Sequence, residues 1–406
     1  MFVWQRSNHL QALSKHVSKL SSPPRCSILS RPFSNLRTAS ESSNRLLRYR
    51  EAQSCRTYCY AKGFLSTRQQ ERSVSSLHTM AAPPTNLTDA VVAAMRTLFP
   101  EELADSAWDN TGLLLGQAPL SSPEAKSESG GTVLLTNDLT SAVVDEALKE
   151  GAKMIVCYRR HLISSHLISF HYTSTTANFM YLDPVIFRPL KSLTTKDPMQ
   201  TQLLRLAAER ISVYCPHTAM DAASGGLNDW LCDILLNGEH QLEAKRTVVQ
   251  PIARPLPEGH QGAGYGRAVE FSQPVALQTL LKRLSSGIGG QRYVMVALPP
   301  GLRDLGKAQD VSKVAVCAGS GADVLQDTDA QVLVTGEMAH HYALRHTQRG
   351  QAVVAVFHSN SERRYLETRL KPMLEIELET TAYGDARVVV SKADRDPFEV
   401  VDVRDL

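Results

Sequence analysis

The stretch Ala355-Val356-Phe357-His358-Ser359-Asn360-Ser361-Glu362 joins an apolar run to a histidine and a carboxylate. The run 353–357 predicts a buried strand that ends at His358, and Glu362 follows four residues later. In α/β proteins, ligands bind at the carboxyl ends of strands, where the next helix begins. An imidazole and a carboxylate at such a place suit a divalent transition metal. Ser359 and Glu362 also have the spacing of a capping box, in which both side chains only fix the start of a helix.

A second stretch repeats the arrangement of an apolar run followed by polar residues. The run 211–214 precedes Cys215-Pro216-His217-Thr218-Ala219-Met220-Asp221, so His217 and Asp221 lie four residues apart. They either share a helical face or lie on a loop around a cation. Taken alone, Asp221 is also typical of a turn residue or a helix cap.

Strand and helix patterns alternate along most of the chain, which is typical of an α/β fold with mostly parallel pairing. In the first part, we expect strands at 132–136, 153–158 and 211–214, and helices at 141–150, 199–210 and 228–236. In the second part, we expect strands at 267–271, 293–298, 314–317, 332–335, 353–357 and 387–390, and helices at 275–285, 338–346 and 361–373. Residues 250–266, rich in Pro and Gly, predict a linker between one lobe at 85–249 and another at 267–406.

Seven motifs, in order from about Leu87 to the C-terminus, resemble one known family. They are 107–116 with Trp108-Asp109-Asn110, 135–140 with Asn137-Asp138, 184–191 with Arg188-Pro189-Leu190-Lys191, 217–228 with His217, Asp221 and Asn228, 317–321 with Gly319-Ser320-Gly321, 335–341 with Glu337 and His341, and 358–362 with His358 and Glu362. They resemble the Nif-three-like proteins (Ngg-one-interacting factor three), also described as GTP cyclohydrolase I type-two homologues, and the eukaryotic members above all.

The resemblance implies two divalent metals at the bottom of a cleft between two α/β lobes. Asp221, His358 and Glu362 match ligand positions, so we expect them to converge on one site. Zinc, manganese and iron all accept such a set. His217 and His341 match family histidines near the metals, where an orienting or substrate-facing role is expected. Glu337 shares this role or forms an ordinary surface pair with His341.

A glycine motif and a short linker complete what the resemblance implies for the fold. Gly319, Ser320 and Gly321 follow a predicted strand and open a helix, so their amides either cradle an anion or only allow a tight turn. Some family members carry a ferredoxin-like domain between the lobes. The span 250–262 is too short for one.

One family ligand is missing from this sequence. The family has a histidine directly after the tyrosine that matches Tyr158, whereas this chain has Arg159, and the motif resumes only at Pro184. The block 159–183 shows no helical or alternating period, and a long structureless insertion inside a compact domain is unusual. It reads as foreign to the working protein, such as translated intron. Its histidines are His161, His166 and His171. We therefore expect the chain to bind metal poorly.

Composition separates the first 80 residues from the rest. They contain ten Arg and three Lys against three Glu and no Asp, while the whole chain has a net charge of +3. An Arg- and Ser-rich, acid-poor segment is typical of a mitochondrial transit peptide. It is also typical of a disordered basic tail, or of upstream sequence left untranslated when Met80 is the start. The seven Cys form no CxxC pair, which favours a reducing compartment.

The resemblance implies a hydrolase-like protein in which a metal activates water for attack on a nucleotide such as GTP. The alternative is a regulatory partner in transcription, with metal stabilising the fold. We expect cytoplasmic protein with mitochondrial and nuclear pools, and a homo-oligomer that the resemblance makes a hexameric ring. The negative body argues against direct nucleic acid binding. No run of 18 apolar residues occurs, which argues against a membrane span.

Overall fold

The computed structural model describes residues 84–107, 109–117, 130–159, 193–302 and 310–405. All of them belong to one compact unit, Ser54–Leu406. The expected leader, 1–80, and the expected block 159–183 after its first residue lie outside the described residues. None of the helices in the described ranges is long and apolar enough to cross a membrane.

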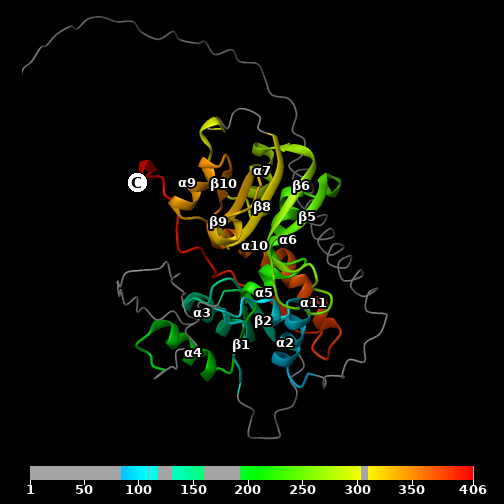
Figure 1. Ribbon diagram of the computed structural model, residues 1–406. Coiled ribbons are helices and arrows are strands. Elements are labelled where there is room, and N and C mark those ends of the chain that lie inside the picture. The colour runs from blue at the N-terminus through cyan, green and yellow to red at the C-terminus, as the bar shows by residue number, and fades with distance from the viewer. Residues whose placement is uncertain (1–83, 108, 118–129, 160–192, 303–309, 406) are drawn as a thin grey trace, which may run out of the picture. The chain divides into compact units, whose positions relative to one another are not determined.

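Within the described residues, the first sheet has five strands in the order β1-β4-β3-β2-β11 (Figure 1). Their bounds are β1 Gly112–Leu115, β2 Thr132–Thr136, β3 Ala152–Cys157, β4 Ser212–Cys215 and β11 Arg387–Val390. All pairs are parallel except β1 with β4. Every residue of β2 and β4 is buried, as expected for a sheet covered on both faces by helices.

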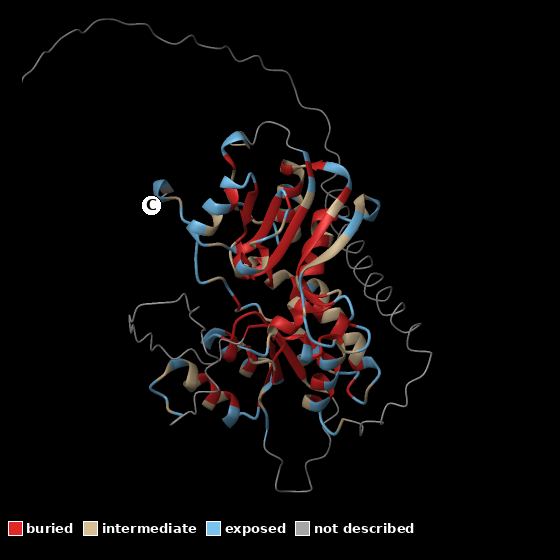
Figure 2. Cartoon of the chain, viewed as in Figure 1, coloured by how far each residue is buried: buried red, intermediate tan, exposed pale blue. Residues whose placement is uncertain are grey.

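Alternate side chains of β2 enter two different cores, because successive residues of a strand point to opposite faces. Val133 and Leu135 pack in the cluster that includes residues of α2 and α11. Leu134 packs in the cluster that includes residues of α3 and α4. The helices are α2 Leu87–Leu98, α3 Ser141–Lys149, α4 Pro198–Ala208 and α11 Lys371–Glu379. Figure 2 shows the buried residues concentrated in the strands and the exposed residues on the outer helices.

The second sheet has six strands among the described residues, in the order β5-β6-β8-β9-β10-β7. Their bounds are β5 Glu243–Pro251, β6 Gly264–Ala276, β7 Met295–Ala297, β8 Asp310–Ser320, β9 Val332–Glu337 and β10 Ala352–Ala355. Mostly parallel pairing is therefore confirmed for the first sheet and wrong for the second. Only β8–β9 and β9–β10 are parallel there. The 252–263 connection between β5 and β6 contains no helix, and parallel neighbours need a long crossover.

Helices cover both faces of the second sheet and join it to the first. The helices α6 Leu227–Leu236 and α7 Leu277–Gly287 pack on each other, and α6 packs on β6 and β8. Leu325 of α8 (Ala322–Leu325) lies in the core of the opposite face. Helix α9 His340–Gln348 packs beside β10. One buried cluster contains both Leu135 of β2 and Val316 of β8, so the two sheets share a core.

Two strands belong to a different sheet from the one that the expected lobe boundaries gave them. β5 lies inside the range expected for the first lobe and its linker, yet it pairs with β6 of the second sheet. β11 lies inside the range expected for the second lobe, yet it extends the first sheet beside β2. Strand pairing follows the edge that is open in space, which a linear division of the chain does not show. The 252–263 connection holds no inserted domain.

The helix expected at 361–373 is divided. The structure has α10 Arg363–Tyr365, a π-helical turn at Leu366–Leu370, and then α11. Pro372 stands in the first turn of α11 and has no amide hydrogen, so it interrupts the regular hydrogen-bond pattern. The helix expected from the sequence took no account of this proline.

Candidate metal centre

The candidate residues lie at the carboxyl ends of strands from both sheets. In the first sheet, Asn137 and Asp138 follow β2, and Arg159 follows β3. Helix α5 (His217–Ala222) begins directly after β4 and carries His217 and Asp221. The second sheet contributes the last residue of β9 and the turn after β10. This edge is where parallel strands of α/β proteins place their ligands.

The imidazole of His358 lies between two carboxylates. Its Nδ1 is 2.9 Å from Oε1 of Glu337, and its Nε2 is 3.4 Å from Oε1 of Glu362. Burial lowers the pKa of His358, but hydrogen bonds to Glu337 and Glu362 outweigh it and raise the pKa to about 9. A carboxylate on one ring nitrogen is the usual support of a metal-binding histidine, because it leaves the other nitrogen directed at the ion.

The capping-box interpretation of Ser359 and Glu362 is wrong. The turn Ser359–Ser361 has no side-chain cap, and the hydroxyl of Ser359 accepts a hydrogen bond from Nη2 of Arg159 at 3.3 Å. Glu362 is turned into the protein, where its side chain is 2% exposed. The spacing was that of a cap, but the carboxylate bonds to groups far away in the sequence.

A glycine lies against the His358–Glu362 pair. A Cβ atom at Gly319 would lie 2.9 Å from Glu362 Oε1 and 2.9 Å from His358 Nε2. Its φ of +64° also favours glycine. Any larger residue would enter the space next to both donor atoms, so the backbone here leaves that space free.

The amides expected to cradle an anion have partners inside the protein. Gly319 N donates to Ser361 Oγ at 2.9 Å, and Gly321 N donates to Thr335 Oγ1 at 3.0 Å. Ser320 is exposed at the end of β8, and α8, which follows, has four residues. These contacts favour the interpretation of Gly319-Ser320-Gly321 as a tightly packed turn.

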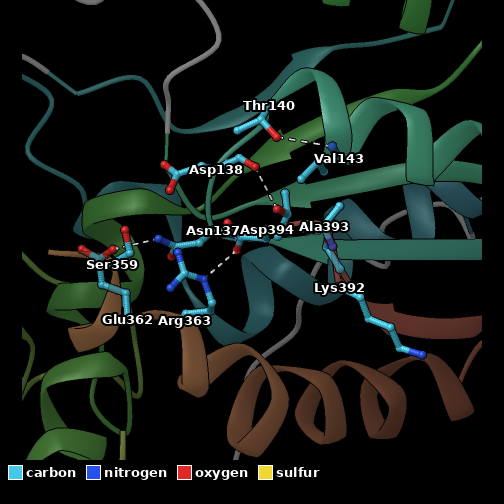
Figure 3. Close-up of polar contacts among 12 residues, drawn as sticks. Asn137, Asp138, Thr140, Val143, Ser359, Glu362, Arg363, Lys392, Ala393 and Asp394 are labelled. Carbon is cyan, nitrogen blue, oxygen red and sulfur yellow. Dashed lines mark hydrogen bonds and ion pairs between the residues drawn. The ribbon is translucent and has the colours of Figure 1, made fainter. Parts of the chain in front are cut away.

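The guanidinium of Arg159 lies inside the centre and contacts two carboxylates. Nε and Nη2 are 2.9 Å and 2.5 Å from Glu362 Oε2, and Nη1 is 3.3 Å from Asp138 Oδ1. Glu362 Oε2 also accepts from Asn137 Nδ2 at 3.1 Å. The Arg159 side chain is 10% exposed. Figure 3 shows Asn137 and Asp138 beside Ser359 and Glu362.

Charge explains how Glu362 stays ionised in this buried position. Burial raises the pKa of Glu362, but His358 and Arg159 outweigh burial and hold the pKa below its ordinary value. Burial lowers the pKa of Arg159, but the two carboxylates outweigh burial and raise the pKa above its ordinary value. The centre is therefore an internal ion cluster in which each charge has an opposite neighbour.

Asp221 forms its contact with Tyr158 rather than with His358. Tyr158 Oη donates to Asp221 Oδ1 at 2.7 Å. Burial raises the pKa of Asp221, His217 and Tyr158 lower it, and the charge of Glu362 raises it again, so the pKa is about 7. Asp221 is thus close enough to Glu362 for their charges to interact.

His217 is oriented by Asp109. Its Nδ1 is 2.7 Å from Asp109 Oδ1, and its ring meets the ring of Tyr158 edge-on at 5.8 Å. Asp109 Oδ2 accepts the amide of Thr218 at 3.1 Å and also its hydroxyl. This pair ties the start of α5 to the 107–116 motif.

His341 is apart from these contacts. It is exposed on α9, and its ring lies 4.4 Å from that of Tyr342. In the described part of the chain, no hydrogen bond or ion pair joins it to His358, Glu362 or Asp221. Glu337 ends β9 before α9 begins, so it contacts His358 and does not share a helical face with His341.

No group of three His, Cys, Asp or Glu side chains within the described ranges is arranged to hold a metal ion. The reason is visible in the contacts. Arg159 donates a hydrogen bond to one carboxylate oxygen of Glu362, and Tyr158 donates one to Asp221. Arg159 stands where the resemblance placed a histidine. His161, His166 and His171 lie outside the described residues.

Sequence reasoning gave no role to several residues of the centre. Asn137, Asp138 and Asp109 lay in matched motifs, which was the available signal, but nothing marked their partners. Asp394 and Arg363 were not noticed: Asp394 Oδ2 accepts Asn137 N at 2.9 Å and Arg363 Nε at 3.3 Å (Figure 3). Among the described residues, Asn137 Oδ1, Arg363 Nη2 and Asp394 Oδ1 are buried without a hydrogen-bond partner.

Comparison with known proteins shows the family of this chain. A sequence model described as Duf34/NIF3 (NGG1p interacting factor 3) matches residues 87–166 and 180–397. The chain belongs to the NIF3 family. The gap in the match, 167–179, lies inside the block 159–183. Protein NIF3 homolog of Schizosaccharomyces pombe is 38% identical over 77% of this chain and 98% of that protein.

Other relatives extend the NIF3 comparison in sequence and in structure. NGG1-interacting factor 3 of Saccharomyces cerevisiae is 35% identical over 77% of this chain and 96% of that protein. The crystal structure of the Bacillus cereus protein related to NIF3 has a TM-score of 0.57 with 18% identity, and covers 79% of this chain and 100% of that one. The mixed α/β architecture with two sheets is thus a NIF3 fold.

Of the residues present, His358 and Glu362 offer two donors to one divalent ion, and the second ion that the NIF3 resemblance implied does not fit. His358 Nε2 and Glu362 Oε1 face each other, His358 is supported by Glu337, and Gly319 leaves the adjoining space free. A second ion would need Glu362 Oε2, which accepts three hydrogen bonds from Arg159 and Asn137. Two ions therefore do not fit around this carboxylate.

Proposed function

We propose that this NIF3-family chain binds a divalent metal at His358 and Glu362 and is hydrolase-like, acting on a nucleotide-type substrate such as GTP. The observation that carries the proposal is the imidazole held at Nδ1 by Glu337 with Nε2 facing Glu362. A cation between Nε2 and Oε1 takes the place of the proton that joins them. Zinc, manganese and iron are all compatible with these donors.

The surrounding residues have distinct parts in this proposal. Glu337 fixes the tautomer of His358 by accepting its Nδ1 proton. A bound divalent ion supplies electrostatic activation of water for attack on a phosphoryl or ring carbon centre. Tyr158 positions Asp221 through a hydrogen bond, and Asp109 orients His217. The His358 side chain is 33% exposed, so solvent and substrate reach it.

Metal uptake tests the binding part of the proposal. We expect the full chain to take up zinc or manganese weakly, as the missing family histidine implies, and His358→Ala to lose this binding, as measured by equilibrium dialysis and elemental analysis. His340→Ala is the matched control, because His340 is exposed at the start of α9. Wild-type protein with no more metal than His358→Ala would refute metal binding at this site.

Turnover tests the enzymatic part. Metal-loaded protein is incubated with a panel of nucleoside triphosphates, and products are separated by chromatography. Metal-dependent conversion of one nucleotide, lost in His358→Ala, supports the hydrolase-like assignment. Metal binding without conversion of any nucleotide supports the second candidate instead.

The second candidate is a regulatory interaction protein with a structural metal. Two observations favour it: the yeast relative is named for interaction with NGG1, and the buried ion cluster joins both sheets. In that case, metal removal lowers the thermal unfolding temperature and leaves no catalytic activity to lose.

A further inference from the structure

The guanidinium of Arg159 bridges two buried carboxylates that follow strands of different sheets, Asp138 after β2 and Glu362 after β10. It contacts Glu362 Oε2 through two nitrogens and Asp138 Oδ1 through the third, with side chains that are 10%, 2% and 12% exposed. Such a bridge is the arrangement that a divalent cation would otherwise provide.

We infer that the Arg159 guanidinium is a built-in cation that occupies the position of a second metal and limits this centre to one divalent ion. The inference rests on the proposed metal binding at His358 and Glu362. It follows from counting acceptors: Oε2 of Glu362 is used by Arg159 and Asn137, whereas Oε1 faces His358 Nε2. Only one side of the carboxylate is left for a metal.

The permanent charge of Arg159 keeps its guanidinium beside Glu362 and Asp138. An arginine side chain does not lose its proton at physiological pH, so it cannot leave the site by neutralisation. Its removal would take this cation away from two buried carboxylates and leave His358 as the charged partner of Glu362, which is costly. A second metal would have to displace a cation that is covalently part of the chain.

Metal stoichiometry tests the inference. The full chain, Arg159→His and Arg159→Ala are loaded with Mn²⁺ and analysed for ions per chain. Arg246→His is the matched control, because Arg246 also pairs with several carboxylates but in a different ion cluster, with Asp229, Asp233 and Glu243. We expect one ion in the wild type and in the control, and two in Arg159→His. Arg159→Ala also frees Glu362 and Asp138, and is expected to take up a second ion at higher Mn²⁺ concentration.

Electron paramagnetic resonance of the loaded wild type gives a readout that does not depend on any variant folding. An uncoupled Mn²⁺ signal supports the inference, and a spin-coupled pair overturns it while leaving the proposed metal binding intact. One ion in both Arg159 variants also overturns it. No ion in the wild type or in any variant refutes the proposed function, and the inference falls with it.

Discussion

The carboxylate of Asp109 accepts hydrogen bonds from His217 and from both the amide and the hydroxyl of Thr218. Burial raises its pKa, but these bonds outweigh burial and lower the pKa below the ordinary value. The ionised form therefore stabilises the fold above the unfolded pKa of about 3.9, and this stabilisation is lost as the pH falls through the lowered pKa.

We expect Asp109→Asn to reduce the free energy of unfolding at pH 7 by about 1.5–3 kcal/mol, the usual value of a hydrogen bond to a charged group. Urea denaturation between pH 7 and pH 3 measures it. The difference from the wild type should shrink as the pH falls below the unfolded pKa, because the wild type then begins to lose the stabilisation that ionised Asp109 gives. Asp145→Asn is the control, because Asp145 is 64% exposed. A pH-independent difference would contradict the assignment.

A substitution at Gly319 separates steric contact from backbone strain. Gly319→Ala adds a Cβ 2.9 Å from Glu362 Oε1 and His358 Nε2 at a φ of +64°. Gly151→Ala has nearly the same φ, +62°, but its Cβ meets nothing within 4 Å. We expect Gly151→Ala to cost about 1–2 kcal/mol and to keep metal uptake.

For Gly319→Ala we expect a larger loss of stability together with reduced metal uptake, measured by urea denaturation and elemental analysis. Equal effects of both substitutions on metal uptake would show that the space beside His358 is not used.

At the scale of elements, β2 shows how a single strand holds two layers together. Leu134 is fully buried in the cluster with α3 and α4. We expect Leu134→Ala to lower the free energy of unfolding by about 2–5 kcal/mol, because it leaves a cavity that rigid neighbours cannot fill. Calorimetry or denaturant titration measures the loss. Leu344→Ala, at a position 51% exposed, should change stability by no more than about 0.5 kcal/mol.

Strands with continuous apolar runs were predictable, whereas their partners were not. Both β2 and β11 have the bounds expected from the sequence, 132–136 and 387–390. Their pairing with each other was not expected, since it joins residues about 250 apart in the chain. The pattern of apolar and polar residues along a strand indicates which of its residues are buried. It carries no information on which open sheet edge the strand will join.

For the candidate site, too, the positions of residues were predictable and their partners were not. The strand-end positions of His358, Glu362 and Asp221 followed from apolar runs and motifs. The partners of Glu362 did not, because Arg159, Asn137 and Glu362 come from three separate segments. Arg159 was read as an interruption of a motif, yet the structure makes it the principal cation of the cluster. Its role depends on which carboxylates fold next to it.

At the scale of the molecule, we propose that copies of the chain assemble with each other, as the NIF3 resemblance implies for rings. The C-terminal residues expose large apolar side chains: Phe398 is 78% exposed and Val403 is 77% exposed, with Val400 and Val401 also exposed. A cluster of this kind marks an interaction surface.

We expect mass photometry at micromolar concentration to show species above the monomer mass. Replacing Phe398 and Val403 by Ser should shift them toward monomer. Leu344→Ser, on α9, tests whether any exposed apolar residue has the same effect. Wild-type protein that is only monomeric would contradict assembly, and an unchanged distribution in the double variant would exclude the C-terminal segment.

The return of β11 to the first sheet has a consequence for synthesis on the ribosome. The other strands of that sheet are complete once β4 ends at Cys215, but the edge of β2 is closed only by Arg387–Val390. At roughly 5–20 residues per second, the intervening chain of about 170 residues takes on the order of 10–35 s to emerge. During that interval the nascent protein presents an unpaired apolar strand edge. A chaperone that covers this edge would therefore matter more here than in a chain whose lobes finish in order.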